Sequence, residues 1–352
     1  MLRVDLQKSF PPGPRSAGFS LDVAFEAAAG VTAVFGPSGA GKTLTMDSIA
    51  GFAQPDSGSV HLGDEAFFDS AAGVDQPARL RRCGYLFQSD ALFPHLTLEE
   101  NLAFSGAPRS RVTELLRQFH IDALGARMPH EVSGGERQRC SIARTLAAAP
   151  RILLMDEPGQ GLDRLLREEL LESIRNLKER LPILLVTHDL SDAFAVADHM
   201  IVILAGRIAQ RGAPEEIYRN PTSLDIARLL GMDAEFSGRV VEAGDDGSVR
   251  IEDANGLRVA ATDTAGLTKG TDVRVCVRPS AVHAAVRNGS LGPLQTPARL
   301  ERWTPAAGGV RLLFEGGLAA EVSREQFVSA KEASEWVLEF PPDAARVFPD
   351  PQ

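Results

Sequence analysis

The pattern of hydrophobic and polar positions changes near residue 232. Before that point, short apolar runs alternate with longer stretches in which apolar residues recur every three or four positions, which is typical of an α/β sheet covered by helices. After it, short β-type runs alternate with Gly, Asp, Asn and Pro turns, which is typical of a small β-barrel or sandwich. We therefore expect an α/β domain over residues 1–232 and a small β-rich domain over residues 233–352.

Several elements of the first domain follow from the same pattern. Three uninterrupted apolar runs, at residues 31–35, 152–155 and 183–186, predict fully buried parallel strands. Residues 200–210 predict a hairpin with Ala205 and Gly206 at its turn, and residues 223–230 predict a closing helix. A long amphipathic helix is predicted by one apolar stripe, formed by Leu162, Leu165, Leu166, Leu170, Ile174, Leu177 and Leu181.

Composition and charge narrow the class of protein. Of the 352 residues, 44% are hydrophobic and 24% charged, as in globular proteins. The net charge of −10 argues against a nucleic-acid partner, since such proteins usually present a basic face. The apolar runs are shorter than the ~18 residues that a membrane span needs. The scattered Cys83, Cys140 and Cys276 form no CxxC pair and suit a reducing compartment.

A phosphate-binding loop follows the first apolar run. Its pattern GxxxxGK[ST] is complete over Gly36, Pro37, Ser38, Gly39, Ala40, Gly41, Lys42 and Thr43. Glycines allow successive N–H groups to point at phosphates, and the helix predicted over residues 43–50 adds its positive N-terminal end. We expect Lys42 to reach the β- and γ-phosphates of a nucleotide and the Thr43 hydroxyl to bind Mg²⁺.

Two carboxylates end the second apolar run. Acidic pairs at strand ends are often plain solvated turn residues, but with a phosphate loop upstream Asp156 is expected to hold magnesium. Glu157 is expected to polarise the attacking water.

Residues 132–136 have two readings. Ser133 followed by Glu136 is a capping box, so a helix is expected to start there. Gly134 and Gly135 in its first turn cost backbone entropy, unless another group has to approach closely. A docking phosphate is the candidate for that group.

Together these segments resemble the ABC-transporter ATPases. The phosphate loop is followed, in that family's order, by residues 86–88, 132–136, 155–158, 161–163 and 187–189, so the resemblance covers about two thirds of the chain. It implies a P-loop NTPase domain with a helical subdomain, ATP with Mg²⁺, and two copies facing each other head to tail. Ser133 and Gly135 of one copy would then bind the γ-phosphate held by the other, and Gly134 belongs to the same nucleotide-binding segment.

The resemblance also implies roles for single residues. Gln88 would sense magnesium and the membrane partner, His188 would contact the γ-phosphate, and Asp163 would couple the two sites. For the aromatic ring that stacks on adenine we choose Phe10, with Phe19 as the alternative and ordinary core packing open for both. Val132 and Gly161 depart from the family's usual Leu and Ala, and the Gly161 change is expected to loosen the coupling loop.

Residues 90–95 and 100–102 resemble the entry to the helical subdomain of binding-protein-dependent importers. The resemblance implies integral-membrane permease subunits as partners, indirectly a periplasmic or lipid-anchored substrate-binding protein, and a peripheral place on the cytoplasmic face of the cell membrane. Likeness is greatest to molybdate importer ATPases, at residues 34–43 and 81–88 and in chain length. Importers of sulfate, iron, polyamines or sugars share most of these features, and a non-transport ABC ATPase is a further alternative.

The C-terminal domain resembles the oligonucleotide-fold-like regulatory domains of such ATPases, notably at residues 275–282. Residues 289–299, where an oxyanion-binding stretch is expected, contain Ser290 and Thr296 but are interrupted by prolines. A role in bracing the dimer is therefore at least as well supported as oxyanion binding.

Overall fold

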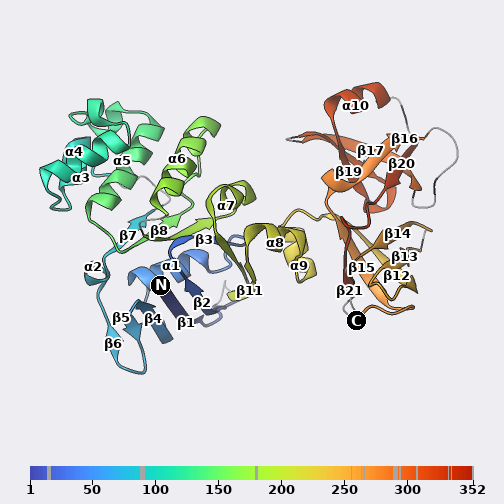
Figure 1. Ribbon diagram of the computed structural model, residues 1–352, viewed down its shortest axis with the longest axis horizontal. Coiled ribbons are helices and arrows are strands. Elements are labelled where there is room, and N and C mark those ends of the chain that lie inside the picture. Colours follow the sequence, from blue (N-terminus) through green and yellow to red (C-terminus); the bar gives the residue numbers. More distant parts are fainter. Residues whose placement is uncertain are drawn as a thin grey trace. The chain divides into compact units, whose positions relative to one another are not determined.

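The chain forms two compact units, Met1–Ile217 and Tyr218–Gln352, in a computed structural model (Figure 1). The structure describes residues 1–13, 17–87, 92–178, 181–254, 256–262, 264, 266–287, 292, 295–306, 308–331, 333 and 335–350. The division between the units falls earlier than the boundary expected from the sequence at residue 232, because the segment after Tyr218 packs with the second unit.

The first unit is built on one mixed sheet, which has eleven strands among the described residues. Its order is β6-β5-β4-β1-β2-β11-β10-β3-β9-β8-β7. The antiparallel part contains β1 (Leu2–Phe10), β2 (Phe19–Ala27), β4 (Ser57–Leu62), β5 (Glu65–Asp69) and β6 (Val74–Asp75). The parallel part contains β3 (Gly30–Phe35), β7 (Cys83–Leu86), β8 (Ile152–Asp156), β9 (Pro182–Thr187) and β10 (His199–Leu204). Strand β11 (Arg207–Gly212) pairs antiparallel with β10 and parallel with β2.

The three predicted buried strands are confirmed as β3, β8 and β9, which lie side by side in the sheet. Every residue of β8 is buried, as expected of a strand covered on both faces. The predicted hairpin is β10–β11, and both Ala205 and Gly206 have positive φ, of 47° and 77°, as a tight type I′ connection requires. The loops that carry the predicted chemistry therefore leave neighbouring strands at one edge of the sheet.

Helices cover the sheet and form a separate cluster. Helix α1 (Lys42–Ala50) follows β3 and ends at Gly51 in the left-handed conformation. A helical subdomain, gathered in Figure 1, contains α3 (Leu98–Ala103), α4 (Arg109–Gln118), η1 (Asp122–Leu124), η2 (Pro129–Glu131) and α5 (Gly134–Ala147). The remaining helices of this part of the chain are α2 (Ala78–Arg81), α6 (Arg164–Leu177), α7 (Leu190–Val196) and α8 (Pro214–Arg219).

Helix α6 is shorter than the predicted apolar stripe, since Leu162 precedes its first residue and Leu181 follows its last. Leu170, Ile174 and Leu177 are buried as expected, but Leu165 is 70% exposed. The helix begins at Arg164, so Leu165 lies in its first turn on the face opposite the core, where no strand of the sheet covers it among the described residues.

The second unit is β-rich, as predicted. Its first antiparallel sheet has the order β14 (Arg258–Ala261), β13 (Val249–Glu252), β12 (Ala234–Ala243), β15 (Asp272–Val277) and β21 (Arg346–Pro349). The second has the order β16 (His283–Val286), β20 (Glu335–Glu339), β17 (Gln295–Ala306), β18 (Gly309–Phe314) and β19 (Ala319–Val322). Short connections η3 (Pro279–Ala281), η4 (Glu315–Gly317) and α10 (Arg324–Ala330) complete it.

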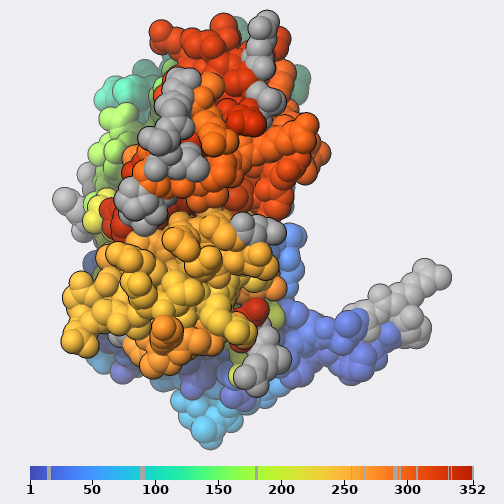
Figure 2. All heavy atoms as spheres, turned by 90° about the vertical axis from the view of Figure 1, so that its right-hand side faces the viewer, coloured from blue at the N-terminus to red at the C-terminus, as the bar shows by residue number. Residues whose placement is uncertain are grey.

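The two sheets of this unit share one hydrophobic core. Val240, Val275, Leu312 and Trp336, from both sheets, belong to the same buried cluster. In Figures 1 and 2 the yellow-to-orange strands of the first sheet adjoin the orange-to-red second sheet. The arrangement is sandwich-like, with the last strand, β21, returning to the first sheet.

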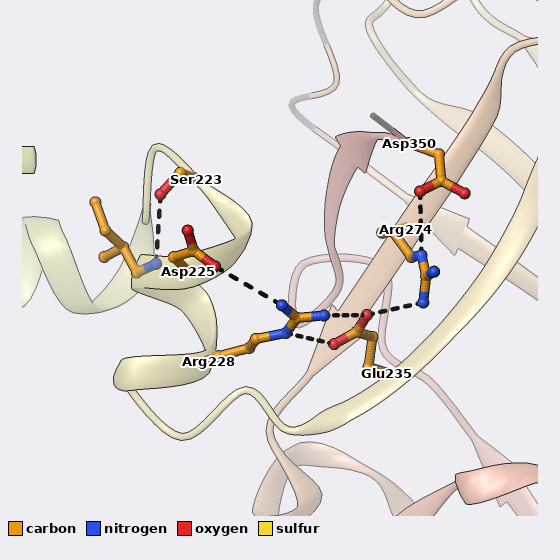
Figure 3. A network of polar contacts seen from close by, with 7 residues as sticks. Ser223, Asp225, Arg228, Glu235, Arg274 and Asp350 are labelled. Carbon is orange, nitrogen blue, oxygen red and sulfur yellow. Dashed lines mark hydrogen bonds and ion pairs between the residues drawn. The ribbon is translucent and has the colours of Figure 1, made fainter. Parts of the chain in front are cut away.

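Helix α9 (Leu224–Leu229) is attached to the first of these sheets by charges and by apolar contact. Arg228 donates to both carboxylate oxygens of Glu235 at 2.8 Å, and Glu235 in turn accepts from Arg274 at 3.1 Å (Figure 3). Beneath this network, Ala227 and Met232 pack in a cluster with Cys276. These contacts explain why residues 218–232, assigned to the first domain from the sequence, group with the second unit.

Candidate active site

A cavity of about 760 Å³ opens where β3, β8 and β9 end. Its wall contains the predicted residues Phe10, Ser38, Gly39, Gly41, Lys42, Thr43, Asp156, Glu157 and His188, and also Phe19, Leu44 and Gln160. Residues separated by more than a hundred positions in the sequence meet here because three neighbouring parallel strands deliver their following loops to one edge.

Glycines permit the loop between β3 and α1 to follow a path closed to other residues. Gly41 has φ of 105°, and a Cβ there would lie 2.7 Å from Leu21 Cδ1. Gly39 has φ of 78°, and no atom lies within 4 Å of the place that a Cβ would take. The Ala40 carbonyl accepts from Gly206 N at 3.0 Å, which ties the loop to the β10–β11 turn.

Lys42 lies inside this loop with its ammonium group oriented by the backbone. Its Nζ donates to the carbonyl oxygens of Gly36 at 2.8 Å and Pro37 at 2.9 Å. Burial lowers the pKa of Lys42, while the carboxylates of Glu157 and Asp156 act in the opposite direction. The loop thus holds a cation at the centre of the cavity, where an anionic ligand can compete for it.

Asp156 and Thr43 place two oxygen atoms side by side. Thr43 Oγ1 donates to Asp156 Oδ2 at 2.8 Å. Burial raises the pKa of the Asp156 carboxyl, and the Thr43 hydroxyl acts in the opposite direction. A hydroxyl and a carboxylate are the hard oxygen ligands that Mg²⁺ accepts. In the described part of the chain no three His, Cys, Asp or Glu side chains gather as a complete metal site. This fits an ion that takes one or two protein ligands and completes its shell with phosphate and water.

Glu157 and His188 form a second polar pair, directly after strands β8 and β9. His188 Nδ1 lies 3.2 Å from Glu157 Oε1, and the histidine side chain is 61% exposed. Glu157 has φ of 47°, a conformation that non-glycine residues adopt rarely and that often marks functional positions. Its N–H is tied to the Val186 carbonyl at 3.0 Å, so the backbone that aims this carboxylate is fixed by the neighbouring strand β9.

Both candidate aromatic rings lie on the cavity wall. Phe10 and Phe19 are directly paired across β1 and β2. Phe19 packs against the hydrophobic core, and its ring is what a Cβ on Gly41 would meet at 3.0 Å. Phe10 is 46% exposed, with Lys8 Nζ 5.6 Å from its ring centroid, and is therefore the more accessible of the two rings.

Residues 133–135 lie away from this cavity, at the start of α5. The predicted capping box is present: Ser133 N donates to Glu136 Oε2 at 2.7 Å, and Glu136 N donates to Ser133 Oγ at 3.4 Å. The two glycines differ. A Cβ on Gly135 would lie 2.2 Å from Leu166 Cδ2, whereas a Cβ on Gly134 would meet only Arg137 Nη2, at 3.7 Å. Packing against α6 therefore explains why position 135 is a glycine, which the sequence pattern did not reveal. At Gly134 there is open space.

The loop before α6 contains the other predicted residues of the first unit. Asp163 is the N-cap of α6, and its Oδ1 accepts from Leu166 N at 3.1 Å. Gly161 has φ of 75°, so a glycine suits this position better than the alanine usual in the family. Gln88, together with Asp90 and Ala91, lies outside the described residues.

Gln160 and Leu44 line the cavity although the sequence analysis did not select them. Gln160 follows Glu157 in a tight turn, in which Gln160 N donates to the Glu157 carbonyl at 3.1 Å. The sequence feature that could have indicated Gln160 is its position three residues after the candidate catalytic carboxylate Glu157. Leu44 follows directly after Thr43, and its position in the phosphate-loop helix was the signal for it.

Comparison with known proteins agrees with this geometry. The model of the ABC transporter family matches residues 21–160. The chain is 39% identical over 278 residues to the molybdenum import ATP-binding protein of Rhodospirillum rubrum, covering 76% of this chain and 74% of that one. It is 38% identical over 264 residues to the sulfate/thiosulfate import ATP-binding protein of Vibrio vulnificus, covering 71% of each. It is 36% identical over 256 residues to the spermidine/putrescine import ATP-binding protein of Vibrio cholerae, covering 70% of this chain and 66% of that one.

A solved structure is similar over part of the chain. The ATP-binding cassette MJ0796, a dimer in a post-hydrolysis state bound to ADP and Pi, superposes with a TM-score of 0.52 at 27% identity. The match covers 61% of this chain and 99% of that one. The family inferred from the motifs is confirmed: the chain belongs to the ABC transporter family as an ATP-binding protein of the import type, and it is an ATPase.

Proposed function

We propose that this ATPase powers a binding-protein-dependent importer, with molybdate as the transported substrate. The observation that carries the proposal is the meeting of Lys42, the Thr43–Asp156 pair and the Glu157–His188 pair in one cavity at the ends of adjacent parallel strands. These groups suit transfer of a terminal phosphate to water, in which positioning and charge neutralisation account for most of the catalysis.

Each side chain has a part in hydrolysis. Phe10 stacks on adenine, and the loop N–H groups with Lys42 bind the β- and γ-phosphates. Thr43 and Asp156 would hold Mg²⁺, together with Gln88, whose position the described residues do not include. When bound, the ion would neutralise charge that develops on the phosphate oxygens. Glu157 accepts a proton from the attacking water, and His188 contacts the γ-phosphate and orients the Glu157 carboxylate.

A second copy of the chain would complete the site. Ser133, Gly134 and Gly135 lie away from the cavity of their own copy, and Gly134 has room for an approaching phosphate. The dimeric state of the similar cassette supports a head-to-tail pair in which these residues close over the partner's nucleotide. Asp163, at the start of α6, would couple the two sites.

Two exposed aromatic groups support contact with a permease. Tyr85 stacks on Phe87 with ring centroids 4.4 Å apart and lies 5.4 Å from Phe52. A second pair, Phe93 and Phe104, has ring centroids 4.4 Å apart. Phe52, Phe87 and Phe104 are all exposed. Exposed apolar rings suit contact with a helix of a membrane protein. No helix in the described ranges is long and apolar enough to cross a bilayer, so these permease subunits would hold the ATPase at the cytoplasmic face of the membrane.

Hydrolysis is tested with Glu157→Gln, which keeps the shape of the side chain and removes its basicity. We expect the variant to bind ATP, to hydrolyse it far more slowly, and to elute as a stable dimer in size-exclusion chromatography with ATP and Mg²⁺. Gln160→Ala, on the same wall, serves as the comparison for a change that keeps the base. A wild-type hydrolysis rate in Glu157→Gln contradicts the assignment of the base.

Molybdate is supported by the similarity to molybdenum import proteins, while sulfate, polyamine, iron and sugar importers remain the alternatives. The substrate-binding protein of the proposed importer is the decisive reagent. Calorimetry with molybdate, tungstate and sulfate should show tight binding of molybdate and tungstate, and preference for sulfate contradicts the proposal.

A further inference from the structure

Arg167 links helix α6 to the segment that contains His188. Its Nε lies 2.7 Å from Asp192 Oδ1, and its Nη2 lies 2.6 Å from Asp189 Oδ2. The arginine is on the second turn of α6, whereas both acids belong to the start of α7. One guanidinium therefore bridges two carboxylates from another element, a fixed fork that lysine cannot reproduce.

The two carboxylates fix the backbone on either side of His188. Asp189 N donates to Thr187 Oγ1 at 3.0 Å, and Thr187 Oγ1 donates to Asp192 Oδ2 at 3.3 Å. The Asp189 carboxylate also accepts from Ser191 N at 2.7 Å, which caps α7. Residues 187 and 189 are thus both tied into the network that Arg167 completes.

His188 itself depends on this network for its orientation. Its side chain is mostly exposed and lies 3.2 Å from Glu157, so packing of the ring contributes little to its position. Arg167 also borders the loop after Glu157, because a Cβ on Gly159 would lie 3.5 Å from Arg167 Cγ. A small cavity of about 150 Å³ is lined jointly by Glu157, Arg167, His188 and Asp192.

Charge reinforces the geometry. The hydrogen bond to Asp192 raises the pKa of the Arg167 guanidinium. Burial opposes ionisation of Asp189, but its hydrogen bonds from Ser191 N and Arg167 outweigh burial and lower its pKa. Asp192 is buried, with 7% of its side chain exposed, and a buried carboxylate without its cation is costly.

We propose that Arg167 is a positioning residue for hydrolysis: by bridging Asp189 and Asp192 it holds His188 beside Glu157. The inference rests on the role of His188 in the proposed function.

The test measures ATP hydrolysis and nucleotide affinity of the full-length chain. Arg167→Ala is expected to lower kcat by on the order of 10- to 100-fold, because small misplacements of catalytic groups carry costs of that size. KM and the Kd for a fluorescent ATP analogue should stay within about twofold, since the phosphate loop is intact. Arg167→Lys should recover part of kcat, and Asp192→Asn, which keeps the shape of the buried side chain, should show the same kcat loss. Arg175→Ala, an exposed arginine two turns along α6, is the control with unchanged kcat.

A double-mutant cycle separates positioning from general loss of structure. If Arg167 acts through His188, Arg167→Ala added to His188→Ala lowers kcat no further. The inference is overturned if the double variant loses the product of the two single-variant losses in kcat. It is also overturned if Arg167→Ala keeps the wild-type kcat while His188→Ala is impaired. In both cases the proposed function stands. A wild-type kcat in His188→Ala removes the assigned role of the histidine itself, and with it the purpose of the bridge. Circular dichroism and urea unfolding of each variant identify loss of fold.

Discussion

The two glycines at the start of α5 have different surroundings, and alanine at each position separates packing from nucleotide approach. At Gly134 the added Cβ meets no atom closer than 3.7 Å, and its φ lies outside the left-handed region. Replacing a helical glycine by alanine gains up to about 0.5–1 kcal/mol, because alanine loses less backbone entropy on folding. Gly134→Ala should therefore be as stable as the wild type or slightly more stable.

At Gly135 the added Cβ lies 2.2 Å from Leu166 Cδ2, 2.8 Å from Cδ1 and 3.0 Å from Cγ. Three contacts of this kind require Leu166 or α6 to move, and overpacking of a filled interface costs about 1–3 kcal/mol. Set against the helix gain of about 0.5–1 kcal/mol, the expected net effect for Gly135→Ala ranges from about zero to a loss of about 2.5 kcal/mol, so this variant should be less stable than Gly134→Ala. Leu166→Ala in the same chain should recover much of the loss by providing space for the methyl group.

Stability is measured by urea unfolding and function by ATP hydrolysis on the same preparations. If the partner's phosphate approaches α5 closely, Gly134→Ala should lose most of its ATPase activity while keeping its unfolding free energy. Wild-type hydrolysis in Gly134→Ala refutes the close approach. A gain in stability for Gly135→Ala as large as that of Gly134→Ala refutes the packing argument, since the contact with Leu166 would then be relieved at no cost.

Three further predictions concern the cavity. Burial raises the pKa of Asp156, so the folded state binds its proton more tightly than the unfolded chain, and stability falls as pH rises through the interval above the ordinary aspartate value. Asp156→Asn should abolish hydrolysis yet raise the melting temperature at pH 7. This gain should vanish as the pH falls toward the ordinary pKa range of aspartate. An unchanged melting temperature at pH 7 would show that burial of the Asp156 carboxylate is not costly. In a magnesium titration of ATPase activity, Thr43→Ser should keep most of the activity and Thr43→Ala should lose it, because serine retains the hydroxyl that contacts Asp156. Equal rates for the two variants would contradict a role for the hydroxyl. Phe10→Ala should weaken ATP binding by about 1–3 kcal/mol, judged from base stacking on aromatic rings, and leave stability unchanged. Phe19→Ala should instead lower the melting temperature, because its ring packs on the core. The opposite pattern would exchange the two roles.

The sequence by itself determined the chemistry and much of the secondary structure. The phosphate loop, the acidic pair after a buried strand and the capping box at Ser133 are local patterns, whose residue types are dictated by backbone conformation and by the ligand. Buried parallel strands were readable from residues 31–35, 152–155 and 183–186, because strands covered on both faces have no polar positions.

Tertiary structure decided what the local patterns left open. The strand order β3-β9-β8 brings Lys42, Asp156 and His188 together, and strand order depends on contacts between distant segments. Leu165 had the spacing of a core residue yet is exposed, because the position where α6 leaves the loop sets which face is covered. From the sequence, the glycine at position 135 had a functional explanation. The structure adds a packing explanation, because Leu166 leaves no room for a side chain there. No sequence motif indicated Arg167, since its proposed role depends on ion pairs with two carboxylates at another helix. Periodicity along a chain encodes which face is apolar, whereas contacts between elements are fixed only when the whole core packs.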